Sequence, residues 1–212
     1  MTTQLKRLSH RHSQKWHEGL RLSLFNSTTT CSGRYTLTAQ ALHWITAALM
    51  FVVLPVAWVM VNVPKSAEFR DLLFTLHKSV GLTIVVLVAV RIAWRAKHPV
   101  PPLEVGLARW EKVAASGSHL VLYVVLVGMP ISGYLLDAAG GYSISYFGLF
   151  SVPLLPKSPA LASAATWVHV AVGQWLVYTL IFLHIAALIW HISVRRDGVL
   201  DRMLPPQQPS RG

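Results

Sequence analysis

The segment that decides the fold is WVHVAVGQWLVYTLIFLHIAALIWHI, residues 167–192. A helical crossing of a bilayer needs about 17 to 25 mainly apolar residues, and this run is long and apolar enough while carrying His169, His184 and His191. Ionisable side chains at membrane depth are costly and usually face the interior of a helix bundle. The segment therefore predicts a transmembrane helix whose imidazole groups serve a purpose inside the bundle.

Three further apolar runs lie near residues 41–63, 76–94 and 120–136. The chain of 212 residues is 53% hydrophobic and 13% charged, with a mean hydropathy of +0.48, whereas a soluble domain carries about 25% charged residues. The runs at 83–90 and 120–127 could each form a core strand of a soluble protein, but four long runs with so few charges disfavour that alternative. The sequence predicts an all-α integral membrane protein, a four-helix bundle.

The net charge of +11 indicates membrane orientation rather than binding to nucleic acid. Of the 19 Lys and Arg residues, only four fall on one side of the predicted membrane: Lys65, Arg70, Lys78 and Lys157. Loops on the cytoplasmic side carry the excess of Lys and Arg. Both termini are therefore predicted to be cytoplasmic.

The predicted membrane domain occupies residues 34–206. Residues 1–33 show no signal-peptide pattern and are expected to form a disordered, basic cytoplasmic extension, and residues 207–212 form a short tail. Cys31 is the only cysteine. The chain's own cysteines therefore cannot form an internal disulfide, an iron–sulfur cluster or the C-x-x-C-H attachment of a haem.

Four histidines fall at two matched depths in the predicted topology. His43 lies near the cytoplasmic start of the first run and His184 lies deep in the fourth, whereas His77 and His169 both lie near the outer side. The fifteen residues from His169 to His184 correspond to about 22 Å of helical rise and an angular offset of about 60°. The depths predict two bis-histidine sites, His43 with His184 and His77 with His169, stacked across the membrane.

Imidazole pairs favour iron in haem as the bound group. Neutral imidazole is a good ligand for iron, and two axial histidines leave no open position on the metal, which suits electron transfer. A transporter for zinc or another cation is the main alternative, but such sites usually add carboxylates or thiolates. The eight acidic residues all lie outside the runs or at their edges, which disfavours the transporter.

His119 and His191 remain, both on the predicted cytoplasmic half. Histidine titrates near physiological pH, so these two are candidates for proton delivery to a quinone or for hydrogen bonding to it. The alternative is that they bond haem propionates or backbone carbonyls. Arg91, Arg95 and Arg195 are likewise either propionate partners or topology signals.

The chain resembles the bacterial cytochrome b561 family of four-helix dihaem membrane cytochromes over residues 34–206. The resemblance rests on an ordered set of short motifs: LHW (42–44), HKSVG (77–81) running on to Arg91, KHPVPP (97–102), SHL (118–120), PISG (130–133), WVH (167–169), LH (183–184), His191 and RDGVLDRMLP (196–205). It implies two haem b groups, held by His43 with His184 on the cytoplasmic side and by His77 with His169 on the outer side. The family is expected to place fourteen residues between the two ligands of the fourth span, and this chain has fifteen. A one-residue π-bulge in that helix would absorb the difference.

The resemblance also implies a function, namely transfer of single electrons between a donor at the outer face and the quinone pool of the bacterial inner membrane. Superoxide:ubiquinone oxidoreductase is the favoured specific activity, with ubiquinone as the electron acceptor. A non-catalytic cytochrome b anchor for a periplasmic electron-transfer protein or a dehydrogenase is the alternative. The four outer basic residues could steer superoxide or dock an acidic protein, and the loop 138–163 is expected to cover the outer haem. The oligomeric state is left open by the sequence.

Overall fold

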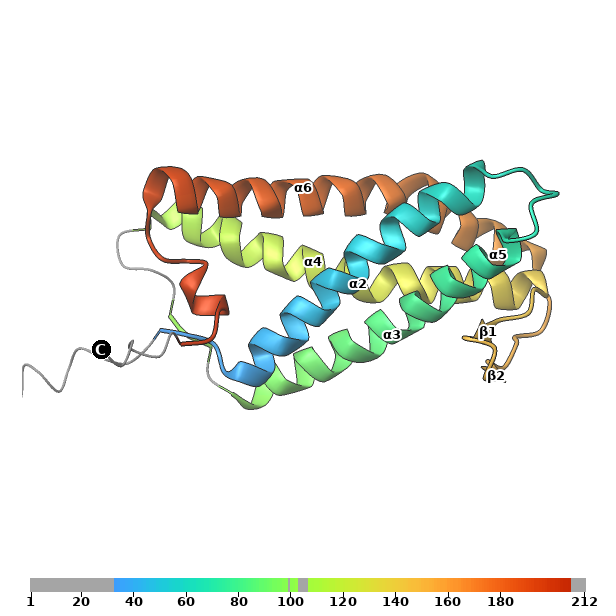
Figure 1. Ribbon diagram of the computed structural model, residues 1–212, viewed down its shortest axis with the longest axis horizontal. Coiled ribbons are helices and arrows are strands. Elements are labelled where there is room, and N and C mark those ends of the chain that lie inside the picture. The colour runs from blue at the N-terminus through green and yellow to red at the C-terminus, as the bar shows by residue number, and fades with distance from the viewer. Residues whose placement is uncertain (1–32, 99, 103–106, 207–212) are drawn as a thin grey trace, which may run out of the picture. The chain divides into compact units, whose positions relative to one another are not determined.

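The structure is a computed structural model that describes residues 33–98, 100–102 and 107–206. The chain divides into two units, Met1–Arg34 and Tyr35–Gly212, and every element below belongs to the second (Figure 1). The predicted disordered extension lies, except for its last residue, outside the described residues, as does the tail 207–212.

Four helical stretches are long and apolar enough to cross a membrane, which confirms the predicted fold class. Three of them are single α-helices: α2 (Leu37–Asn62), α3 (Arg70–Lys97) and α4 (Arg109–Gly140). The fourth stretch, Pro159–Arg195, is composite. It consists of α5 (Pro159–Thr166), a π-helix η1 (Trp167–Gly173), α6 (Gln174–Trp190) and a second π-helix η2 (His191–Arg195).

The helices α2 and α4 begin before their apolar runs, at caps that hydropathy does not detect. The Thr36 hydroxyl accepts from the backbone N–H of Ala39 at the start of α2. At the start of α4, the backbone N–H of Ala108 donates to the Glu111 carboxylate (2.7 Å). Gly141 ends α4 with a φ of 81°, a left-handed conformation that glycine adopts without strain.

The helices pack through a small apolar core. α2 lies against α3, α3 against α4, and α4 against α5, η1 and α6 (Figure 1). Val53, Val80, Ile84 and Val88 are buried together between α2 and α3. Large side chains such as Phe182 (70% exposed) face outward instead, as expected where lipid tails surround the helices.

The connection between α4 and α5 carries a short antiparallel hairpin, β1 (Ser145–Tyr146) with β2 (Phe150–Ser151). The predicted loop 138–163 is therefore shorter than expected, because α4 continues to Gly140 and α5 already begins at Pro159. The hairpin lies at the same end of the bundle as α5 (Figure 1). Its contacts on α3 position it beside His77: Phe147 donates its N–H to the Ser79 hydroxyl (2.8 Å), and Lys78 donates to the Ser143 carbonyl (3.2 Å).

At the other end, the short 3-10 helix η3 (Asp201–Met203) returns to the start of α2. The indole N–H of Trp44 donates to the Met203 carbonyl (2.8 Å), and the backbone N–H of Tyr35 donates to the Arg202 carbonyl (3.0 Å). Two of the sequence motifs, LHW and RDGVLDRMLP, are thus joined in space next to His43.

Candidate functional site

Two pairs of histidine rings face each other between helices. His43 of α2 and His184 of α6 have ring centroids 6.3 Å apart with the planes at 62°. His77 of α3 and His169 of η1 have centroids 6.1 Å apart with the planes at 87°. The structure therefore brings together the same two pairs that the depths along the sequence indicate.

These separations fit one metal ion between the two rings of each pair. An imidazole nitrogen lies about 2 Å from a bound first-row metal ion, so two such bonds account for about 4 Å of each centroid separation. The remaining 2 Å or so corresponds to the two ring radii. The chain thus offers two bis-imidazole sites, and haem iron is a metal commonly held by axial histidine.

In the outer pair, the hydrogen bonds of His169 fix its tautomer. Its Nδ1 atom lies 2.9 Å from the Met129 carbonyl oxygen, which can only accept, so Nδ1 carries the proton and Nε2 is left with its lone pair for a metal. The opposing Nδ1 of His77 is buried and has no hydrogen-bond partner in the described part of the chain, with the Val53 backbone beside the ring. Both rings therefore suit ligation.

The π-helix η1 places His169 in this pair. A π-helix inserts an extra residue into a helix and commonly occurs at functional sites. The structure shows such a segment from Trp167 to Gly173, where the fifteen-residue spacing predicts a bulge. The extra residue is absorbed between His169 and His184, so both face the bundle interior toward their partners.

The inner pair has an additional histidine and a cation beside it. The His119 ring of α4 has its centroid 6.0 Å from that of His184, so His184 faces two imidazoles. The Arg91 guanidinium, which can only donate, lies 2.8 Å from Nδ1 of His43 and over the Tyr123 ring at 5.6 Å. An imidazole that binds iron through Nε2 carries its proton on Nδ1, so iron binding at His43 requires Arg91 to release that nitrogen.

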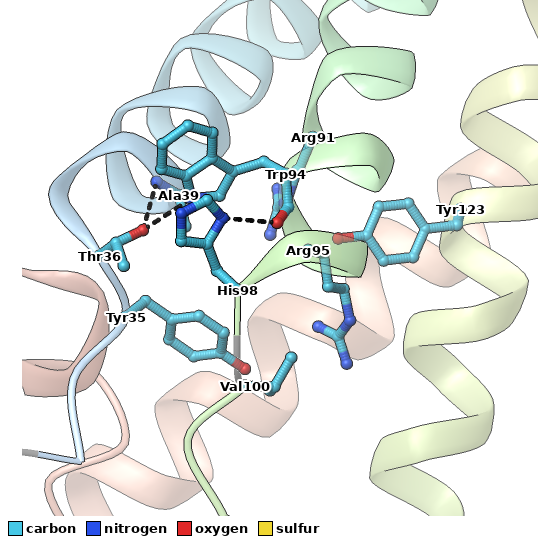
Figure 2. Close-up of a pocket in the computed structure, with 9 residues that line it drawn as sticks. All are labelled: Tyr35, Thr36, Ala39, Arg91, Trp94, Arg95, His98, Val100 and Tyr123. Carbon is cyan, nitrogen blue, oxygen red and sulfur yellow. Dashed lines mark hydrogen bonds between the residues drawn. The ribbon is translucent and has the colours of Figure 1, made fainter.

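Figure 2 shows the basic pocket that adjoins this pair at the start of α2, with Arg91, Arg95 and Tyr123 among its lining residues. Its volume is about 30 Å³. The His98 ring stacks on the Trp94 indole at 3.9 Å with an interplanar angle of 11°, and the indole N–H donates to the Thr36 hydroxyl (2.9 Å). These contacts make a rigid wall, and the two arginines provide positive charge for a carboxylate or phosphate group.

His191 makes a different contact from His119. Its Nδ1–H donates to the Asp197 carboxylate (2.6 Å), and Arg195 links that carboxylate (3.3 Å) to Glu111 of α4. Burial raises the pKa of Asp197, but the hydrogen bond and charge of His191, the Val199 N–H and the Arg195 charge outweigh it and lower that pKa below its usual value of 3.8. Sequence patterns assign no role to these acidic residues, because the contacts form only where the start of α4 lies beside the end of η2.

The predicted outer cations are not equivalent. Lys78 forms an ion pair with Asp137 (3.1 Å) in which both side chains are less than one-fifth exposed, so its charge is largely neutralised. Arg70 lies over the Phe74 ring at 4.6 Å. Asp137 lies near the end of α4, and its ion pair with Lys78 shows that this turn of α4 faces α3. Hydropathy alone does not reveal how the helix is rotated about its axis.

Comparisons with known proteins identify the family of the chain. The family model described as prokaryotic cytochrome b561 matches residues 34–206. The chain belongs to this family. It is 31% identical over 179 residues to cytochrome b561 homolog 2 of Escherichia coli (strain K12), which covers 84% of this chain and 95% of the relative. It is also 26% identical over 177 residues to "Probable superoxide oxidase CybB" of Yersinia pestis, which covers 82% of this chain and 98% of the relative.

Family membership defines the general role of the chain. It is a multi-pass protein of the bacterial inner membrane that takes part in membrane electron transfer, and the family implies b-type haem. The histidine pairs lie on three of the four helical stretches that are long and apolar enough to cross a membrane.

Proposed function

We propose that this cytochrome b561 family member holds two haem b groups, one in each histidine pair, and transfers single electrons between a donor at the outer face and ubiquinone at the cytoplasmic side. The observation that carries the proposal is the pair of ring separations, 6.1 and 6.3 Å, each between one histidine of the composite span Pro159–Arg195 and one histidine of α2 or α3. His169 and His184 are separated by about 22 Å of helical rise, which is most of a hydrocarbon core about 30 Å thick. When bound, haem supplies reversible one-electron redox chemistry.

Superoxide is the donor that the outer surface suits. Lys65, Arg70 and Lys157 lie on the side that the charge distribution assigns to the exterior, and a small anion is attracted by such a surface. Hydrogen bonds to Ser79 and Lys78 fix the hairpin and its loop beside His77. In this proposal a small donor approaches the outer histidine pair from the side of this loop. Two superoxide anions each lose one electron and become dioxygen, and these two electrons with two protons convert one quinone to its quinol.

The two protons enter at the cytoplasmic end. His119 adjoins the inner pair, where its imidazole can donate to a reduced quinone oxygen, and the His191–Asp197 pair (2.6 Å) offers a second exchangeable proton nearer the aqueous phase. In this proposal the chain's groups hold and deliver protons, whereas the histidine pairs serve only the electrons.

Stopped-flow measurement of superoxide decay tests the donor assignment. Purified protein with ubiquinone should accelerate decay over spontaneous dismutation, and quinol should form at one equivalent for every two superoxide anions consumed. If protein that contains both haems does not accelerate the decay, superoxide is rejected as the donor. The electron-carrier function is then unaffected. A reduced-minus-oxidised spectrum with haem quantitation tests the carrier itself, since one haem or none per chain contradicts it.

A protein donor is the second candidate, and the exposed tip of the hairpin favours it. Leu149 is 77% exposed and Phe150 is 58% exposed at the outer end, an arrangement that could dock a periplasmic electron-transfer protein or a dehydrogenase subunit. In that case the chain acts as a cytochrome anchor, and substitution of Leu149 and Phe150 by Ser slows reduction by the protein partner while leaving superoxide chemistry unchanged.

A further inference from the structure

One turn of α4 forms a close-fitting support for His169. The residues of this turn are Met129, Ser132 and Gly133, and they contact the ring on both its Nδ1 and its Cε1 edges. None of them is part of the histidine pairing described above. Their contacts determine the orientation of the ring.

The hydrogen bonds at Nδ1 form a closed set of three. Ser132 donates its hydroxyl proton to the Met129 carbonyl (2.9 Å), so its oxygen is left to accept from the Nδ1–H of His169 (3.1 Å). The same N–H points to the Met129 carbonyl (2.9 Å). Nδ1–H is therefore shared between two acceptors, and Ser132 is only 5% exposed, so water does not compete strongly for them.

Glycine provides the space for this contact. A Cβ at position 133 would lie 3.0 Å from Cε1 and 3.3 Å from Nδ1 of His169. At position 173, where η1 ends, a Cβ would lie 2.2 Å from the Met129 sulfur. The two glycines thus allow α4 and the π-helix to approach until the ring reaches both acceptors.

Two acceptors on Nδ1–H have an electronic consequence. A hydrogen bond from the remote nitrogen raises the basicity of the ligating nitrogen, and a more basic ligand stabilises the oxidised, more positive iron. The inner pair has the opposite environment, because the positive Arg91 lies beside His43. Even after Arg91 releases the Nδ1 nitrogen, a cation near the ring favours the reduced iron.

We propose that Ser132, with the Met129 carbonyl, is a positioning residue for His169 that fixes its tautomer and ring orientation and gives the outer haem a lower midpoint potential than the inner haem. The proposal rests on the two-haem function and adds its direction: an electron that arrives at the outer site moves downhill toward the cytoplasmic site.

Redox titration of the purified dihaem protein, followed by its visible spectrum and by electron paramagnetic resonance, tests this. Ser132→Ala should raise the lower of the two midpoint potentials, with an increase of about tenfold in the ratio of reduced to oxidised haem at a fixed potential, equal to about 59 mV for one electron. It should leave the higher potential unchanged. Ser132→Thr should restore the original value, because it keeps the hydroxyl and the adjoining groove of about 250 Å³ leaves room for a methyl group.

Matched variants on the same helix serve as controls. Ser118→Ala removes a hydroxyl that bonds only within its own helix, to the Ala115 carbonyl, and should change neither potential. Gly133→Ala should perturb the resonance signal of the outer haem, whereas Gly128→Ala, where a Cβ meets nothing within 4 Å, should not.

The outcomes separate this inference from the proposed function. Ser132→Ala protein that holds two haems with both potentials unchanged overturns the inference, even if its thermal stability falls. A wild-type outer potential above the inner one overturns the direction. Wild-type protein without two haems contradicts the proposed function instead.

Discussion

His184 is the residue on which the inner site depends, because it faces His43 at 6.3 Å and His119 at 6.0 Å. Only one of these two can be its axial partner. Family resemblance assigns His43, while the Arg91 contact to His43 shows that this ring already has a cation beside it that must move. His119 is the proposed proton donor, and Arg91 and Arg95 lie close enough to act on its ring electrostatically.

Single substitutions test the four ligands. His184→Ala should remove the inner haem and His169→Ala the outer haem, each leaving one haem per chain, because one imidazole alone holds a six-coordinate haem weakly. Haem quantitation and the reduced-minus-oxidised spectrum measure this. His98→Ala, which breaks the stack on Trp94 and the hydrogen bond to the Trp94 carbonyl, should keep both. Retention of two haems by His169→Ala would contradict the outer site.

Asp197 supports a prediction on pH. Its lowered pKa means that the ionised carboxylate stabilises the folded state above pH 3.8, and that this contribution is lost as the pH falls through the lowered value. Asp197→Asn should therefore lower the unfolding temperature at pH 7 by about 2 °C, with the difference from wild type shrinking as the pH falls below 3.8. Thermal scans of haem release measure it, and Asp201→Asn is the control. A difference that stays the same as the pH is lowered below 3.8 would rule out the ionised carboxylate as the cause.

Among the elements, the π-helix η1 accounts for the difference between the fifteen-residue spacing of the two ligands in this chain and the fourteen residues expected. A π-helical turn accommodates one extra residue within an α-helix without rotating the rest of that helix. The segment Trp167–Gly173 does so on the outer side of α6, and its last residue, Gly173, packs against Met129. The structure therefore explains how fifteen residues still bring both histidines to their partners.

Changing the length of η1 gives an element-scale prediction. Deletion of Val172 should convert the segment to regular α-helix with fourteen residues between the ligands, and both haems should remain. Insertion of one Ala after Val172 adds about 100° of rotation and 1.5 Å of rise, which should remove the outer haem while the inner one stays. Haem content and resonance spectra distinguish the two variants. Loss of the outer haem in the deletion variant would contradict this prediction. It would show that the outer site requires the π-helical geometry and not only the correct ligand spacing.

At the scale of the whole molecule, hydropathy and charge predict the four spans and the depths of the histidines, because both depend only on position along a straight helix. Contacts that depend on rotation or on side-chain reach were not predicted: the Arg91–His43 contact, the Lys78–Asp137 ion pair and the His191–Asp197 hydrogen bond. Each joins side chains of different segments, so its geometry depends on how those segments are rotated against one another, which hydropathy does not fix.

The orientation of the molecule in the membrane is the remaining prediction, and the proposed direction of electron flow depends on it. The excess of Lys and Arg assigns the end with Arg91 and Arg195 to the cytoplasm, and the loop with Ser143 to the exterior. A membrane-impermeant maleimide applied to intact spheroplasts should therefore label Ser143→Cys made in a Cys31→Ser background. The native Cys31 should react only after permeabilisation. The reverse pattern would invert the two haem sites, place the quinone chemistry of His119 and His191 at the outer face, and contradict the proposed function.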